Sequence, residues 1–389
     1  MRQLIQTSMA RKRTSGSGRG SEARVGVSPG LLISLATMAM VGAVSAAPAH
    51  GSTRLAFTSS QPDEYYSNYS VFESGGSIYV GTGTGVSVSN DNGASWTNLP
   101  RNTNGLPNSS VTSIYVSGGK VFAATSGGVS ISGDIGADGT PTGSWTTYTR
   151  NNTNGGLASN SNRDIHVNGL NIYTAMNNNP GGGVGVSTDG GLTWETLSGN
   201  GLGGTSGTSV AAVYESNGVI YAGTSAGGVS VTSDGGGEWT TFDTDDGLSS
   251  NAIFCVFESG GVIYAGTDHD GLNISADGGD SWDTYNTTNG LVGDSVTGVY
   301  VIGGFIYVAT TKGLSIGRSE DGGVSWENYT EADGLADDVL QGVYVSDGTV
   351  YTVGWGGVSL GGGASAVPGA GVAGLATLGR AGLARRRRR

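Results

Sequence analysis

The sequence predicts an all-β fold, a seven-bladed β-propeller built from four-stranded antiparallel blades. The first observation is composition: the 389 residues include 73 Gly, and only 13% of them are charged. Gly, Ser, Thr, Asn and Val are abundant while Lys, Glu and Leu are few, which favours short strands and tight turns over helices. The second observation is repetition. One strand pattern recurs seven times along the chain, and a turn running from Asp to Trp recurs six times.

Residues 1–49 are expected to be a secretory signal peptide that precedes the fold. A basic region around Arg11 and Arg13 is followed by the apolar run Leu31–Val44 and then by small residues. Basic, then apolar, then small residues is the order found in signal peptides, and we expect cleavage after Ala47 or Ala49. An uncleaved membrane anchor is the alternative, although the apolar run is short for a span.

The second strand of each predicted blade is the most regular element. Each copy carries an aromatic residue, and successive aromatics are 43 to 51 residues apart. The seven aromatics are Tyr79, Phe122, Tyr173, Tyr221, Tyr264, Tyr307 and Tyr351.

Three further strands accompany each copy. The preceding segment ends in a Gly-containing turn, as in Val213–Gly218, which predicts a hairpin because Gly readily adopts positive φ. The following segment alternates, as in Val86–Val88, with apolar residues on one face. An Asp-containing turn then leads to a fourth strand headed by Trp, as in Trp239–Phe242. Four such strands in about 45 residues make one propeller blade, and its apolar faces require neighbouring blades to stack on it.

The two ends of the repeat predict how the ring closes. The first three strands occur seven times, but the Asp turn and the Trp strand are missing after Leu360. The segment Arg54–Thr58 aligns with Trp145–Thr149, so we expect this N-terminal strand to complete the last blade. Closure would remove the free sheet edges of an open array. The predicted propeller spans residues 53–361, and a six-bladed ring with the remainder as a flap is the alternative.

Residues 362–389 are predicted to be a linker and a C-terminal sorting or anchor tail. Val367–Ala370 is followed by a mildly apolar stretch and the cluster Arg385–Arg389. The arrangement resembles the PEP-CTERM sorting tails of bacteria, with Pro368-Gly-Ala in place of the usual Pro-Glu-Pro and Arg380 within the apolar stretch. Together with residues 1–49, this implies a secreted or envelope-associated protein at the outer surface of a bacterium.

The recurring Asp turn resembles the Asp-box, or BNR repeat, of sialidases, xyloglucanases, sortilin-type receptors and photosystem assembly factors. Ser275, Asp277, Gly279 and Trp282 match its pattern S-x-D-x-G-x-x-W. The links between blades, such as Asn104–Val111, also resemble two-component-regulator propeller repeats. In Asp-box families this turn lies away from the active face, which implies a structural role for its residues. They are Asp91, Trp96, Trp145, Asp189, Trp194, Asp234, Trp239, Asp277, Trp282, Asp321 and Trp326.

The physics of the turn favours the same role. The Asp carboxylate can accept backbone N–H groups of its own turn, and the Trp is expected to fill the gap between blades.

Charge and rare residues limit the chemistry. Between the basic ends, the body holds seven basic against thirty acidic residues, which should repel nucleic acid. The single cysteine, Cys255, excludes an intramolecular disulfide and is predicted to be a buried core residue. His166 takes the place of a strand aromatic and is also predicted to be core. We expect no metal, no cofactor and no catalytic set.

Two groups of residues break the repeat and form the candidate ligand face, opposite the Asp turns. They are Asp268, His269 and Asp270, in a loop between second and third strands, and Arg163 and Asp164, at the start of an inner strand. The first group has two interpretations, a divalent-cation or polar-ligand site and an ordinary solvated turn. Two carboxylates are few for a Ca²⁺ loop.

The expected function is that of an exported, non-catalytic binding or scaffolding module. The expected protein is a monomer whose ligand is a polysaccharide or a protein, with membrane contact only through the signal or the tail. The alternative is a carbohydrate-active enzyme, a glycoside hydrolase or lyase, with its site on the candidate ligand face. A surface-layer or matrix component is a third possibility. A sialidase is disfavoured because the five arginines of the body occupy different blade positions.

Overall fold

The structure is a computed structural model that describes residues 55–62, 67–107, 109–177, 182–199, 201–203, 209–318 and 325–362. The chain divides into two units, Met1–Ser52 and Thr53–Arg389, and every described residue lies in the second. The predicted signal peptide, the sorting tail beyond Gly362 and Asp321 all lie outside the described residues. Among the described residues, no helix is long and apolar enough to cross a membrane.

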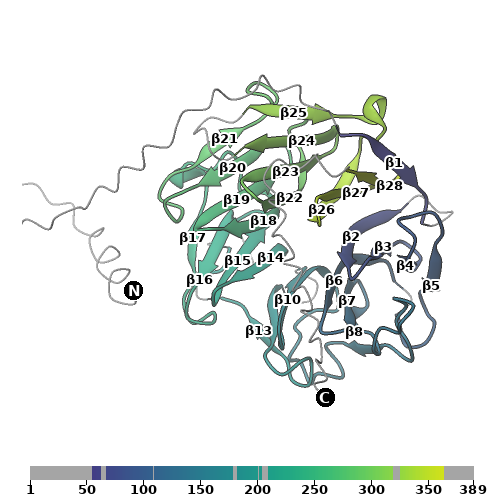
Figure 1. Ribbon diagram of the computed structural model, residues 1–389. Coiled ribbons are helices and arrows are strands. Elements are labelled where there is room, and N and C mark those ends of the chain that lie inside the picture. The colour runs from purple at the N-terminus through teal and green to yellow at the C-terminus, as the bar shows by residue number, and fades with distance from the viewer. Residues whose placement is uncertain are drawn as a thin grey trace, which may run out of the picture. The chain divides into compact units, whose positions relative to one another are not determined.

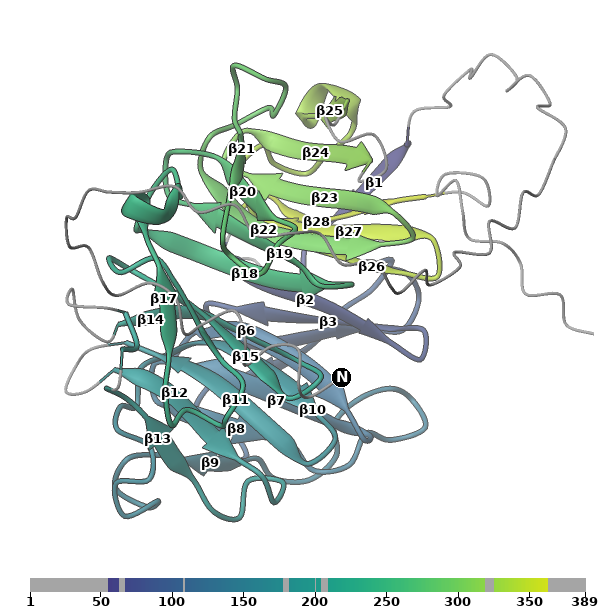
Figure 2. The same cartoon turned by 90° about the vertical axis from the view of Figure 1, so that its left-hand side faces the viewer.

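The second unit is a ring of seven four-stranded antiparallel sheets, as predicted, and the six-bladed alternative is wrong. Figure 1 shows the first strand of each sheet nearest the central axis. In the side view, consecutive sheets lie face to face (Figure 2). Two short 3-10 helices, η1 (Thr244–Asp246) and η2 (Glu331–Asp333), lie in links between blades.

Each blade takes its strands in chain order, and we number the blades from 1 to 7. Blades 1 and 2 comprise β2 (Asn68–Ser74), β3 (Ser77–Thr82), β4 (Gly85–Ser89), β5 (Thr97–Pro100), β6 (Val111–Ser117), β7 (Lys120–Thr125), β8 (Gly128–Ile131) and β9 (Thr146–Tyr148). Blades 3 and 4 comprise β10 (Asn162–Asn168), β11 (Asn171–Met176), β12 (Gly183–Ser187), β13 (Glu195–Leu197), β14 (Val210–Ser216), β15 (Val219–Thr224), β16 (Val229–Thr232) and β17 (Thr240–Phe242). Blades 5 and 6 comprise β18 (Ile253–Ser259), β19 (Val262–Thr267), β20 (Leu272–Ser275), β21 (Asp283–Tyr285), β22 (Val296–Ile302), β23 (Phe305–Thr310), β24 (Gly313–Arg318) and β25 (Trp326–Tyr329). Blade 7 comprises β26 (Leu340–Ser346), β27 (Thr349–Gly354), β28 (Gly357–Gly361) and β1 (Phe57–Ser60).

The N-terminal strand closes the ring, as expected. β1 pairs antiparallel with β28 and becomes the fourth strand of blade 7, and Figure 1 shows the purple β1 beside the yellow β28. The predicted alignment, however, is wrong by three residues. Ser60 pairs with Val358 as Tyr148 pairs with Val129, so Phe57 and not Arg54 stands at the Trp position of the repeat.

The reason for this register is the aromatic slot between blades. The Phe57 ring meets Tyr329 edge-on at 5.5 Å between centroids, as Trp194 meets Tyr148 at 5.7 Å. Arg54 could not fill that slot. The backbone N–H of Leu55 also donates to the Tyr329 hydroxyl, which fixes the strand against blade 6.

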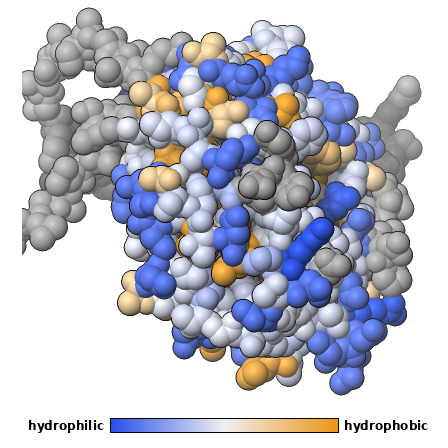
Figure 3. Space-filling model, turned by 90° about the vertical axis from the view of Figure 1, so that its right-hand side faces the viewer, coloured by the Kyte–Doolittle hydropathy of each residue, from blue (hydrophilic) through white to orange (hydrophobic). Residues whose placement is uncertain are grey.

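Burial follows the position of a strand within its blade. The second strands, such as β3 and β11, are almost wholly buried because both neighbouring blades cover them. The fourth strands, such as β9 and β21, lie at the outer rim and are only partly buried. One side of this rim is shown in Figure 3, where polar residues dominate and apolar ones are scattered.

The hydrophobic core is divided into seven clusters, one between each pair of adjacent blades. As predicted, each motif Trp contributes to one of these clusters, and Phe57 contributes to the seventh. Trp145, Trp194 and Trp239 are buried, whereas Trp96, Trp282 and Trp326 are half-buried. The apolar surface of every blade is therefore covered by its neighbours, as a ring of stacked sheets requires.

Alternating strand direction gives the ring two faces. The Asp-turn face carries the turns between first and second strands and those between third and fourth strands. The link face carries the loops between second and third strands, such as Asp268–Asp270, and the links between blades, such as Asp243–Ala252. At the hairpins of the Asp-turn face, pairs such as Gly75 and Gly76 adopt φ of 63° and 83°, so the predicted positive-φ turns are confirmed.

Candidate functional site: the channel mouth

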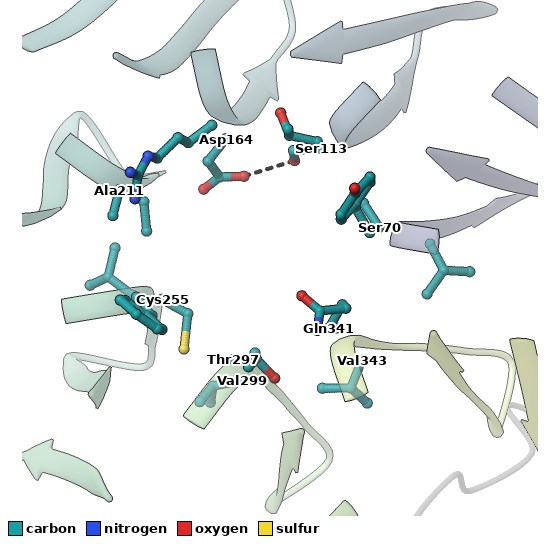
Figure 4. A pocket seen from close by; sticks show the side chains of 18 residues that line it. Ser70, Ser113, Asp164, Ala211, Cys255, Thr297, Val299, Gln341 and Val343 are labelled. Atoms are coloured by element: carbon teal, nitrogen blue, oxygen red, sulfur yellow. Dashed lines mark hydrogen bonds between the residues drawn. The ribbon is translucent and has the colours of Figure 1, made fainter. Parts of the chain in front are cut away.

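A cavity of about 300 Å³ lies on the ring axis and is lined by residues of all seven blades. It is lined by the first halves of all seven inner strands, β2, β6, β10, β14, β18, β22 and β26, where these strands begin at the link face. Figure 4 looks into this cavity, which we call the channel mouth. A deeper cavity of about 250 Å³ shares Ser113, Asp164 and Val256 with it and leads to the aromatic residues further along the same strands.

A β-bulge at the second residue of every inner strand shapes the rim of the mouth. The register skips one residue in each blade, so that residue is released from the ladder. The seven bulged residues all line the mouth: Tyr69, Thr112, Arg163, Ala211, Phe254, Thr297 and Gln341. The bulges therefore place chemically different side chains at one level around the axis.

The next residue of each strand forms a second ring, deeper in the mouth. Its members are Ser70, Ser113, Asp164, Ala212, Cys255, Gly298 and Gly342. Six of them are small and uncharged, and the seventh is Asp164. In Figure 4 the carboxylate of Asp164 and the hydroxyl of Ser113 lie beside each other at the edge of the open space.

The carboxylate of Asp164 joins three blades. Its Oδ1 accepts the Ser113 hydroxyl at 2.8 Å, and its Oδ2 accepts the Val213 N–H at 3.0 Å. Oδ1 also accepts the adjacent Ile165 N–H. Burial raises the pKa of the carboxyl, and the bonds from Val213 and Ser113 oppose that shift.

Cys255 belongs to the same ring, and the prediction of a buried core residue holds only in part. It packs against the core cluster between blades 5 and 6, but it is half-buried and also forms part of the wall of the mouth. Burial raises the pKa of its thiol to about 12, so it is an unreactive wall residue at neutral pH. The alternation of apolar residues around Cys255 could not reveal this, because inner strands face the channel as well as the core.

An aromatic ring lines the deeper cavity below the second ring of small residues. Each blade contributes one side chain, and each side chain touches the next all the way round. The seven are Phe72, Tyr115, His166, Tyr214, Phe257, Tyr300 and Tyr344, with centroid separations between 4.5 and 5.4 Å. His166 is buried within this ring, as predicted.

His166 should make the stability of the ring pH-dependent. Burial lowers its pKa to about 4, although Glu215 opposes this shift. The unfolded chain binds a proton near pH 6.5, so the unfolded state holds more protons between pH 6.5 and 4. The contribution of His166 to the free energy of unfolding should therefore be fully present above pH 6.5. It should fall by about 3 kcal/mol as the pH drops to 4.

This contribution can be isolated with His166→Phe, because Phe72 and Phe257 already occupy equivalent positions. Urea unfolding at pH 7 and pH 4 should show a smaller pH-dependent loss for the variant than for the natural protein. Equal losses in both proteins would contradict the assignment.

The other predicted candidates lie apart from the mouth. Asp268, His269 and Asp270 form the loop between β19 and β20 on the link face, and none of them is among the residues lining the cavity. His269 is exposed and its Nδ1 lies 2.9 Å from the Ser295 hydroxyl and 3.2 Å from an Asp268 carboxylate oxygen. Among the described residues, no group of three metal-ligating side chains is assembled. Arg163 and Asp164, by contrast, both line the channel mouth.

The Asp turns have a geometry that explains their repetition. The Asp277 carboxylate accepts the Ser275 hydroxyl at 2.9 Å and both the N–H and the hydroxyl of Ser281, at 2.9 and 2.6 Å. Asp91, Asp189 and Asp234 likewise accept the hydroxyl two residues before them and the N–H four residues after them. Bonds from Ser281 and Ser275 hold the pKa of Asp277 at about 2, so the carboxylate stays ionised at any ordinary pH.

The glycine of this turn is required by space as well as by conformation. Gly279 has φ of 102°, and a Cβ there would meet the Phe242 ring of the preceding blade at 2.4 Å. The Asp turn is thus fitted against the neighbouring blade, and its carboxylate is committed to its own loop.

The comparisons with known proteins agree on the fold. No protein family and no curated protein matches this sequence. Among solved structures, the extracellular domain of a protein assigned as a hybrid two component system from B. thetaiotaomicron is similar at 17% identity with a TM-score of 0.61. The match covers 79% of this chain and 41% of that one, so this chain spans about two fifths of that protein's length.

Two further structures match over almost their whole length. YCF48 bound to D1 peptide is 14% identical with a TM-score of 0.59, covering 80% of this chain and 97% of that one. Virginiamycin B lyase from Staphylococcus aureus is 14% identical with a TM-score of 0.56, covering 79% and 98%. At these identities the likeness establishes a propeller and nothing about chemistry, since the matched proteins include an extracellular domain, a peptide complex and a lyase.

The rings of the channel mouth could have been found in the sequence only in part. Aligning the inner strands on their shared bulge places Asp164 with Ser70, Ser113 and Cys255, which marks it as the charged exception. The predicted ring places the seven inner strands around one axis, but the sequence does not show which residues of each strand face it.

Proposed function

We propose that this protein is an exported, non-catalytic binding module whose ligand enters the channel mouth. One observation supports this proposal. The polar cavity has a volume of about 300 Å³, and among the described residues that line it only Asp164 carries a carboxylate. A typical glycosidase uses two carboxyl groups facing each other across the substrate. The Asp164 carboxylate instead accepts hydrogen bonds from Ser113, Ile165 and Val213, which belong to three neighbouring blades.

Export and placement are part of the same proposal. The basic, apolar and small-residue order of residues 1–49 and the arginine-ended tail 362–389 support delivery to the cell envelope or the extracellular matrix. That some matched structures are extracellular domains is compatible with this. We also infer that the Asp turns are Asp-box repeats, which the shared hydrogen bonds from Ser or Thr to Asp support.

Blocking the mouth tests the proposal. Gly342 has room for a side chain, because an added Cβ meets nothing closer than Val353 Cγ1 at 3.4 Å. The natural protein and Gly342→Trp would be screened against a glycan array and against proteins of the extracellular matrix. A ligand retained by the natural protein should be lost from Gly342→Trp.

The matched control is Leu192→Trp, at an exposed residue of the Asp-turn face. If binding survives Gly342→Trp but is lost in Leu192→Trp, the ligand site lies on the Asp-turn face, and the proposed site is contradicted. Turnover of a polysaccharide that requires Asp268, Asp270 or Arg163 would instead favour the enzyme alternative.

A further inference from the structure

Asp164 is the one charged member of the deeper ring, and its charge has no cationic partner. Among the described ion pairs, none involves Asp164, and the neighbouring Arg163 is exposed at the rim. Asp164 is half-buried in the wall of the channel mouth. A carboxylate in this position is held less favourably than in bulk water unless a cation approaches it.

One acceptor position on this carboxylate is left over. A carboxylate offers about four lone pairs, two on each oxygen. Oδ1 accepts two hydrogen bonds, from Ser113 and Ile165, whereas Oδ2 accepts only the N–H of Val213. Oδ2 can therefore accept one further N–H from a group in the channel.

The floor of the channel suits a positive group on an apolar stem. Seven aromatic side chains surround the axis at this level and pack against one another. Four of them, Tyr115, Tyr214, Tyr300 and Tyr344, carry phenolic oxygens that can accept hydrogen bonds. Because Asp164 lines the same deeper cavity, an ammonium beside its carboxylate would share that cavity with these tyrosines.

Charge on the link face points in the same direction. The described loops and links of this face carry ten carboxylates, all in blades 4 to 7, against the three cations Arg101, Arg150 and Lys312, while Arg163 lies at the rim of the mouth itself. The carboxylates are Asp243, Asp245, Asp246, Asp268, Asp270, Asp294, Glu331, Asp333, Asp337 and Asp338. Such a field raises the local concentration of cations near the mouth and speeds their association.

We propose that the channel mouth binds an alkylammonium group, either a lysine side chain of a partner protein or a free diamine, with its nitrogen donating to Oδ2 of Asp164. This inference rests on the proposed function, because it names the ligand chemistry of that same site. Because Asp164 belongs to the deeper ring, a group that enters from the link face places its methylene stem along the bulged residues of the rim.

Calorimetry on the full protein tests the inference with four probes. Two are small, hexamethylenediamine and the neutral hexanediol. Two are peptides with a glycine-serine sequence around one lysine or one acetyl-lysine. The amine of each pair should bind at least about tenfold more tightly than its neutral counterpart, since a charge-assisted hydrogen bond is lost with the charge. Tighter binding of the lysine peptide than of the diamine would identify a protein lysine as the source, and the reverse order a small amine.

Variants locate the binding. Asp164→Ser copies the residue of blades 1 and 2, Ser70 and Ser113, and should weaken amine binding at least about tenfold. Asp270→Asn removes a charge of the link face that does not line the channel mouth. This substitution should change the affinity for the amine by less than about threefold. Should Asp164→Ser not fold, Gly342→Trp serves instead, and it should abolish amine binding.

Two results would overturn the inference. One is equal binding of amine and neutral probes, and the other is unchanged amine binding in Asp164→Ser or Gly342→Trp. The proposed function would stand without this inference if the amines fail to bind but a ligand found in the screen binds the natural protein and not Gly342→Trp. A screened ligand indifferent to Gly342→Trp would overturn the proposed site itself.

Discussion

Removal of residues 1–60 should abolish cooperative folding of the ring, because it deletes β1 from blade 7. Blade 7 would keep three strands, and β28 would become an open edge. The deletion also removes the buried Leu55 and the Phe57 contact with Tyr329. Two apolar side chains and a four-residue strand ladder correspond to about 5 kcal/mol or more, which is comparable with the whole stability of many domains.

The matched control is removal of residues 1–52, which takes away the first unit and keeps β1. Urea unfolding should then give the same midpoint as the full chain. For the longer deletion, size-exclusion chromatography should show dimers or aggregates formed through the free edge of β28. A monomeric, normally stable ring without β1 would show that closure by this strand is dispensable.

Trp194→Ala should destabilise the ring by about 3–5 kcal/mol, the usual cost of truncating a buried aromatic side chain. Trp194 is 9% exposed and packs between blades 2 and 3, against Tyr148. Its Nε1 donates to the Gly191 carbonyl at 3.1 Å, so the substitution also leaves an acceptor in the Asp turn without its donor. Chemical denaturation followed by circular dichroism measures the change.

Trp355→Ala is the control of the same residue type, because Trp355 lies in the loop between β27 and β28 and is 53% exposed. Its cost should stay within about 0.5 kcal/mol. A finer comparison uses Phe at two positions. Among the described residues, the Nε1 of Trp239 has no acceptor, so Trp239→Phe should cost less than Trp194→Phe. Equal costs for Trp194→Ala and Trp355→Ala would refute the assigned role of the motif tryptophan.

The repeat made most of the fold predictable. Alternation in segments such as Val86–Val88 predicted strands with one apolar face, and the structure buries β4 throughout, including Ser87 on the other face. The missing Trp strand after Leu360 located the closure, and β1 fills that place. Register was less predictable. The predicted alignment of the repeats matched Phe57 with Tyr148. In the structure Phe57 packs against Tyr329 and therefore occupies the Trp position of the repeat.

The candidate site was predictable only as a set of exceptions. Arg163 and Asp164 departed from their repeat, and the structure brings both to the channel mouth. Asp268, His269 and Asp270 departed equally, yet they occupy a separate loop on the link face. A residue that differs from its equivalents in the other repeats can be identified from the sequence. Its distance from other such residues cannot.

By itself, the sequence determined the blade and the number of blades, because these depend on contacts within one repeat or between adjacent repeats. The tertiary structure alone decided what lies on the axis. The bulges, the small residues around Asp164 and the aromatic ring come from seven strands that are 43 to 51 residues apart. Only closure of the ring brings them together, and it places one carboxylate, that of Asp164, in the wall of a cavity.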